Sequence, residues 1–139
     1  MISFDELSVG VEVFTSSRVV TREEVKAYAD ASGDQNPLHQ DDVVARAAGF
    51  PGVVAHGMFT MGTLASALLQ RLGDAATLER LSAQFRSPVF VGETIESGGS
   101  VRSLDRESRA AVLDVWVRLD RNGTVEWPIR RGEAQIRFV

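Results

Sequence analysis

The sequence contains no cysteine, which excludes disulfide bonds, thiolate metal ligands and a cysteine nucleophile. It is also poor in basic residues: 15 Lys and Arg stand against 19 Asp and Glu, and no basic cluster marks a nucleic-acid interface. The N-terminus carries two early acids and lacks the basic-then-apolar pattern of a secretory signal. We therefore expect a cytoplasmic protein, without nucleic-acid partners.

The stretch between Arg46 and Arg71 has no charged residue when His56 is neutral. Its length is that of a membrane-spanning helix. Gly49, Pro51 and two further glycines interrupt it, however, and these residues break a transmembrane helix. We expect no membrane contact.

Length and composition indicate one ordinary globular domain over residues 1–139. The chain is 44% hydrophobic and 24% charged, and it has no internal repeat, linker or low-complexity segment. A chain of this size should bury roughly 68–70% of its unfolded surface, which is enough for a core without covalent cross-links.

Three helices are predicted in the first half of the chain. Thr21 and Glu24 have the spacing of a capping box, which predicts a helix over residues 22–31 that ends at Gly33. Asp41 or Asp42 can cap a short helix that runs to residue 48. The third helix, Gly57 to Leu72, is apolar nearly all round, as is typical of a helix buried on most sides.

Strand-like patterns occupy residues 9–20, 78–85, 93–101, 109–120 and 124–138. In the first strand, Val11, Val13 and Val19 are expected to face inward. Asn122-Gly123 is a strong hairpin signal, so the last two strands should pair antiparallel. Because strands do not alternate with helices after Leu72, we predict an α+β fold with an antiparallel sheet in meander-like order.

Asp34 and His39 are the main candidates for chemistry. They lie five positions apart around Asn36-Pro37, and a carboxylate and an imidazole on one stiff loop can serve as a general acid/base pair. Each residue also has a structural interpretation. Asp34 follows Gly33 as a turn former would, and His39 could be a packed, hydrogen-bonded imidazole.

His56 and Gly57 form a second candidate group. The first amides of a helix lack partners, so the Gly57 amide could stabilise an oxyanion, although the glycine could equally serve tight packing. His56 could be a second base, a substrate contact or a structural imidazole, and we favour the last. Seventeen positions separate the two histidines, which matches no short ligand spacing, so no metal site is expected.

Two blocks of sequence resemble the MaoC-like, (R)-specific enoyl-CoA hydratase (hydratase 2) family. They are YADASGDQNPLH, residues 28–39, and AHGM, residues 55–58, and the resemblance continues through FRSPV, VGE and GEA over nearly the whole chain. It implies a single hot-dog domain, in which an antiparallel sheet wraps the central helix from Gly57 to Leu72. It also implies that two such units pair, as a homodimer or as a heterodimer with a related subunit.

The resemblance further implies an activity. Asp34 and His39 would act as a dyad that adds water syn to a trans-2-enoyl thioester, giving the (R)-3-hydroxyacyl product, or catalyses the reverse dehydration. Gly57 would polarise the thioester carbonyl, with Asn36 and His56 supporting the loop. No metal or redox cofactor is implied, and CoA or acyl carrier protein would carry the acyl group. Gly62 departs from the pattern, since some relatives have a serine there.

Two alternatives remain at this stage. A hot-dog thioesterase would hydrolyse the thioester, although the Asp-x-Asn-Pro-x-His pattern resembles the hydratases. A non-catalytic acyl-binding subunit of a heterodimeric dehydratase would not need both Asp34 and His39. No Gly-x-Ser-x-Gly elbow, phosphate loop or dinucleotide fingerprint supports a third chemistry.

Overall fold

One curled antiparallel sheet of five strands forms the body of the protein. The computed structural model describes all 139 residues. The strands stand in the order β1-β3-β4-β5-β2. They are β1 (Glu12–Val19), β2 (Ala76–Ser82), β3 (Thr94–Asp105), β4 (Ala110–Arg121) and β5 (Thr124–Phe138). The predicted antiparallel α+β fold is confirmed, and β4 and β5 pair around Asn122-Gly123 as predicted.

The predicted meander is wrong for β2. This strand pairs with β5 at the edge of the sheet and not with β3, the next strand along the chain. The connection from β2 to β3 crosses the sheet and makes two isolated bridges, Val54 with Phe90 and Phe85 with Ile129. Spacing along the sequence could not reveal this crossing, because it depends on contacts between distant segments.

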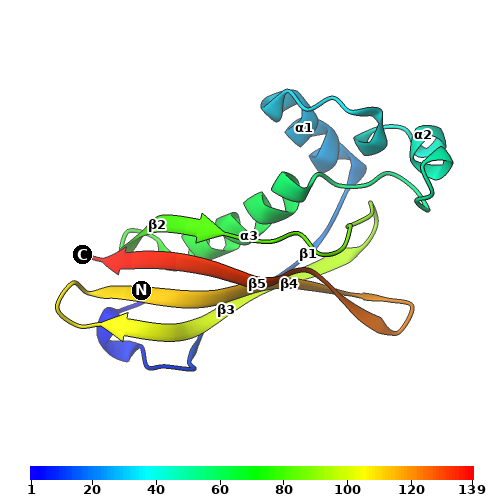
Figure 1. Cartoon of the computed structure of the whole chain (residues 1–139). Helices are drawn as coiled ribbons and strands as arrows, with labels where there is room; N and C mark the ends of the chain where they lie inside the picture. The colour runs from blue at the N-terminus through cyan, green and yellow to red at the C-terminus, as the bar shows by residue number, and fades with distance from the viewer.

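The helix α3 (Gly57–Leu72) lies against one face of the sheet (Figure 1) and has the predicted bounds. Leu64, Leu68 and Leu72 are fully buried against the sheet. Met58 and Leu69 are about half exposed, at 54% and 49%, so α3 is covered on fewer sides than its composition predicted. None of the helices is both long and apolar enough to cross a lipid bilayer.

The helix α1 (Arg22–Ser32) begins and ends on the predicted local signals. The Thr21 hydroxyl accepts the Glu24 amide and donates to the Glu24 carboxylate, at 3.2 and 2.9 Å. Gly33 ends the helix in the left-handed region, with φ of 81°. Together with α2 (Asp42–Ala47), α1 stands at one end of the sheet, beyond the start of α3 (Figure 1).

Asp42 connects α2 to the segment that leads into α3. Its Oδ1 accepts the Val53 amide at 3.0 Å, and its Oδ2 accepts from the Arg22 guanidinium at 2.9 Å. The Val53 hydrogen bond, with the charge of Arg22, lowers the pKa of the Asp42 carboxyl below its ordinary value. The chain entering His56 is therefore tied to α2.

The inward face of β1 differs from the prediction. Val13 is buried as expected, but Val11 and Val19 are exposed, and Phe14 is buried beside Val13. The register of β1 on β3 shifts between Glu12 and Phe14. Such a bulge breaks the strict alternation of side chains, so two neighbouring residues can face the core.

Candidate active site

The loop between α1 and α2 carries Asp34 and His39 and places their side chains next to each other. The Asn36 side chain accepts the Leu38 amide at 3.0 Å and thereby starts the short 3-10 helix Pro37–His39. The Asn36 amide donates to Asp34 Oδ1 at 3.2 Å, and the His39 amide donates to the Asn36 carbonyl at 2.9 Å. Asn36 therefore closes the turn that separates the two candidate residues.

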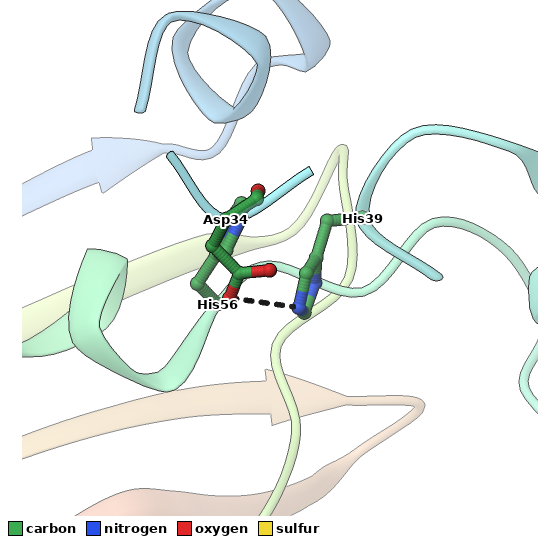
Figure 2. A group of neighbouring side chains, drawn as sticks. All are labelled: Asp34, His39 and His56. Carbon is green, nitrogen blue, oxygen red and sulfur yellow. Dashed lines mark hydrogen bonds and ion pairs between the residues drawn. The ribbon is translucent and has the colours of Figure 1, made fainter. Parts of the chain in front are cut away.

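The hydrogen bonds of His39 define which ring nitrogen is free. Nδ1 lies 2.6 Å from the Val54 carbonyl oxygen. A carbonyl oxygen only accepts, so Nδ1 carries the hydrogen, and in the neutral ring Nε2 then carries a lone pair. Nε2 faces the Asp34 carboxylate, 4.0 Å from Oδ2 (Figure 2). That distance is too long for a direct hydrogen bond but suits two groups that share one water molecule.

His56 supports both members of this pair. Its ring is only 3% exposed and stacks on the His39 ring, with centroids 3.7 Å apart and planes inclined by 25°. Its Nε2 donates to the main-chain carbonyl of Asp34 at 3.1 Å. The Tyr28 and His56 rings pack edge to face, with centroids 4.8 Å apart. These contacts are what a structural imidazole would make, and the structural role of His56 stays a prediction.

Gly57 is the first residue of α3, directly after His56, and no side chain caps this helix end. The first amides of a helix have no partner within the helix, so the Gly57 amide is available to an acceptor. A Cβ atom at Gly57 would lie 3.2 Å from the Phe85 ring. Both the packing and the oxyanion interpretations therefore have a physical basis here.

The sequence did not predict the contact between Phe85 and Gly57. Phe85 belongs to the FRSPV block, but 28 positions separate it from Gly57, and no local pattern links the two. Its side chain is 48% exposed and lies beside a helix terminus. An exposed aromatic ring at that place can line a substrate path.

Asp34, His39 and His56 could also ligate a cation, because one ligand atom from each lies within 4.8 Å of the others. The fold thus brings together groups whose sequence spacing suggested no metal site. His39 Nδ1 and His56 Nε2 already donate to carbonyls, so only the other nitrogens could bind a metal. The absence of a catalytic metal stays a prediction.

A cavity of about 410 Å³ lies between α1 and α3, next to the site. Tyr28 and Phe59, whose rings pack edge to face, are part of its lining, as is Gly62. A Cβ atom at Gly62 would meet nothing within 4 Å. The Thr63 hydroxyl donates back to the Phe59 carbonyl at 3.1 Å, so its hydrogen is not available in place of that of a serine at position 62.

A curled antiparallel sheet around a central helix defines the hot-dog fold class. The structure is similar to that of an (R)-hydratase from A. caviae involved in PHA biosynthesis, with a TM-score of 0.84 and 29% identity over 96% of this chain and 98% of that one. The predicted hot-dog fold is therefore confirmed.

Residues 8–117 match the protein family described as MaoC like domain. A 3-hydroxybutyryl-CoA dehydratase of Methylorubrum extorquens is 31% identical over 114 residues, which cover 81% of this chain and 72% of the relative. The chain belongs to the MaoC-like family. A mitochondrial 3-hydroxyacyl-[acyl-carrier-protein] dehydratase of Arabidopsis thaliana is 42% identical over 93 residues, 64% of this chain. The chain spans about half the length of that plant protein, since the match covers 52% of it.

Proposed function

We propose that the protein is an (R)-specific enoyl-thioester hydratase, which also catalyses the reverse dehydration of (R)-3-hydroxyacyl thioesters. The observation that carries this proposal is the free Nε2 of His39, held 4.0 Å from the Asp34 carboxylate. The hydratase and dehydratase names of the family relatives support the same reaction class.

In the hydration direction, His39 Nε2 accepts a proton from a water molecule that Asp34 orients. The water oxygen attacks C3 of the enoyl thioester, and the C2–C3 π electrons move toward the thioester carbonyl oxygen. The Gly57 amide stabilises this enolate oxygen. A proton then passes from the dyad to C2, which restores the dyad and completes the addition of H and OH. Both groups arrive from the side of one dyad, so the addition is syn.

A second hot-dog unit is proposed to cover the exposed side of α3. Met58 and Leu69 lie 11 positions apart, so they share one face of the helix, and both are about half exposed. A second copy of the chain or a related subunit would bury this stripe. Sedimentation at micromolar concentration should give the mass of a dimer, and a monomer would contradict the proposal.

We also propose that turnover requires neither a metal nor a redox cofactor. A divalent cation at Asp34, His39 and His56 would occupy the lone pair that the reaction needs. Exhaustive dialysis against EDTA should leave the rate unchanged, and added Zn²⁺ should inhibit. A loss of activity with EDTA that Zn²⁺ restores would instead establish a metal enzyme.

Incubation of the purified protein with crotonyl-CoA tests the reaction class. We expect the enoyl absorbance to fall without release of free thiol, and the Asp34→Asn variant to lose most of this activity. Thiol release would identify a thioesterase. No turnover by the purified chain, with recovery on addition of a related hot-dog subunit, would identify an accessory subunit.

A further inference from the structure

A pocket of about 420 Å³ on the sheet, outside the dyad, is lined by three arginines and a tryptophan. The lining residues are Arg86, Ser87, Val125, Glu126, Trp127, Arg130 and Arg131. Glu126 is the only acid among them, so the pocket carries a positive charge in a chain whose net charge is −4. Guanidinium groups present paired donors that suit phosphate oxygens.

The pairing of β5 with β4 explains how two consecutive arginines reach this pocket. Val115 pairs with Gly132 and Val117 pairs with Ile129. Two residues of β5, Arg130 and Arg131, therefore stand opposite one residue of β4, Trp116. An extra residue of this kind is a β-bulge, and it re-aims side chains that would otherwise alternate. Both arginines are accordingly exposed, whereas the residues on either side of them are buried.

A second irregularity in β5 joins the pocket to the segment before β3. The register shifts again between Val117 and Leu119, where Pro128 interrupts the ladder. The Pro128 carbonyl instead accepts the Arg86 amide at 2.9 Å. This bond holds Arg86 beside the strand that carries Trp127 and Arg130.

The arginines of the pocket differ from most arginines of the strands in having no acidic partner, although Arg80 of β2 also lacks one. Arg102, Arg118 and Arg137 each form an ion pair with a carboxylate of a neighbouring strand. Neither Arg130 nor Arg131 forms one, and the Arg86 guanidinium donates only to the Gln84 side chain, at 2.8 Å.

Two further groups favour a nucleotide over a bare anion. The Arg130 guanidinium lies 5.9 Å from the Trp127 ring, and such planar groups can stack on a purine. The Ser87 hydroxyl is buried in the pocket lining and has no partner in the chain, so it can donate to a ligand.

The pocket is linked to the candidate site through one residue. Phe85, whose ring lies against Gly57, directly precedes Arg86. A thioester held at the Gly57 amide would therefore have its carrier running past Phe85 toward the arginines. We propose that the pocket binds the phosphates of the nucleotide portion of CoA, with its adenine beside Trp127. This inference rests on the proposed function, because it takes the acyl carrier to be CoA.

The test compares crotonyl-CoA with crotonyl-pantetheine, which lacks the nucleotide. Arg130→Ala and Arg131→Ala should each raise KM for crotonyl-CoA about 10-fold, the usual worth of one charge-assisted hydrogen bond, and leave kcat unchanged. Neither should change kcat/KM for crotonyl-pantetheine. Arg106→Ala is the matched control, because Arg106 is an exposed arginine in the β3–β4 turn, away from the pocket, and its loss should change nothing.

Equal losses on both substrates would mean that the arginines act through the fold, and unchanged KM for crotonyl-CoA would exclude the pocket. Crotonyl-acyl carrier protein serves as a third substrate. If the arginine variants lose kcat/KM only for that substrate, the assignment of the pocket to CoA is also overturned. Calorimetry with adenosine 3′,5′-bisphosphate separates this proposal from the activity. We expect the wild-type protein to bind this bisphosphate even if the proposed reaction class is wrong. The double variant Arg130→Ala, Arg131→Ala should bind it at least 10-fold more weakly. No binding by the wild type, or equal binding by both, would refute the pocket.

Discussion

The two histidines of the chain stack on each other at 3.7 Å, but the segments that carry them leave different nitrogens free. The loop after α1 holds His39 through Nδ1, which donates to the Val54 carbonyl, and leaves Nε2 toward the Asp34 carboxylate. The turn before α3 holds His56 through Nε2, which donates to the Asp34 carbonyl, and buries the ring.

Under the proposed function, position and tautomer give these two residues of the same type different roles: His39 transfers protons, and His56 supports the loop. His39 has its lone pair at the open side of the stack, beside a carboxylate that is 53% exposed. His56, the buried ring of the stack, donates to the main-chain carbonyl of that same aspartate.

The largest expected effects fall on the dyad. Asp34→Asn and His39→Gln should each lower kcat with crotonyl-CoA by roughly 10²–10⁴-fold, the usual contribution of a general acid or base. Asp34→Asn keeps the size of the side chain, whereas His39→Gln is slightly smaller and removes the ring stack on His56, and circular dichroism should show an intact fold for both. Near-normal turnover by either variant would refute the assignment of the dyad.

The second prediction separates the amide of Gly57 from its small size. Alanine and proline at position 57 both add a Cβ against Phe85, but only proline removes the N–H, and the first position of a helix tolerates proline. In a Phe85→Leu background that relieves the contact, Gly57→Ala should retain most activity. Gly57→Pro should lose about 10²–10³-fold in kcat, the cost of one oxyanion donor. Equal activity of the two double variants would assign Gly57 to packing alone.

His56 should contribute less than the dyad, and two variants separate its contacts. His56→Phe keeps a ring against His39 but removes the donor to the Asp34 carbonyl, whereas His56→Gln keeps a donor and removes the stack. One hydrogen bond is worth about 2–10-fold, so His56→Phe should lower kcat by that amount. A loss as large as that of His39→Gln would show that His56 itself transfers protons.

The smallest expected effect concerns Asp42 and acid stability. Its pKa is lowered in the folded protein, so its stabilising effect is present above the unfolded value of about 3.9 and is lost as the pH falls through the lower folded value. Asp42→Asn should lower the Tm modestly at pH 7, and the difference from wild type should begin to shrink below about pH 4 and vanish once the pH is below the lowered folded pKa. The exposed Asp74→Asn serves as the control. A difference that persists in acid would contradict this account.

The sequence predicted best those features that local chemistry determines. The capping pair before α1, Gly33 at its end and the bounds of α3 all follow from residues within one or two turns of the helix termini. The Asp34 and His39 pair was visible because a single short loop carries both.

Contacts between distant segments could not be predicted in this way. The place of β2 beside β5, the stack of His39 on His56 and the contact of Phe85 with Gly57 each join segments that the sequence keeps apart. The bulge at Arg130 and Arg131 belongs to the same class, because register depends on the partner strand. The proposed nucleotide pocket depends on the bulge at Arg130 and Arg131, and the packing around Asp34 and His39 depends on the histidine stack.

The tautomers of the two histidines test the central claim most directly. The chain has only two histidines, so long-range ¹H–¹⁵N spectra of the imidazole rings, assigned with the His56→Gln variant, resolve both. We predict that neutral His39 carries its hydrogen on Nδ1 and that neutral His56 carries it on Nε2. A hydrogen on Nε2 of His39 would leave no lone pair toward Asp34 and would contradict the proposed role of His39 as the base.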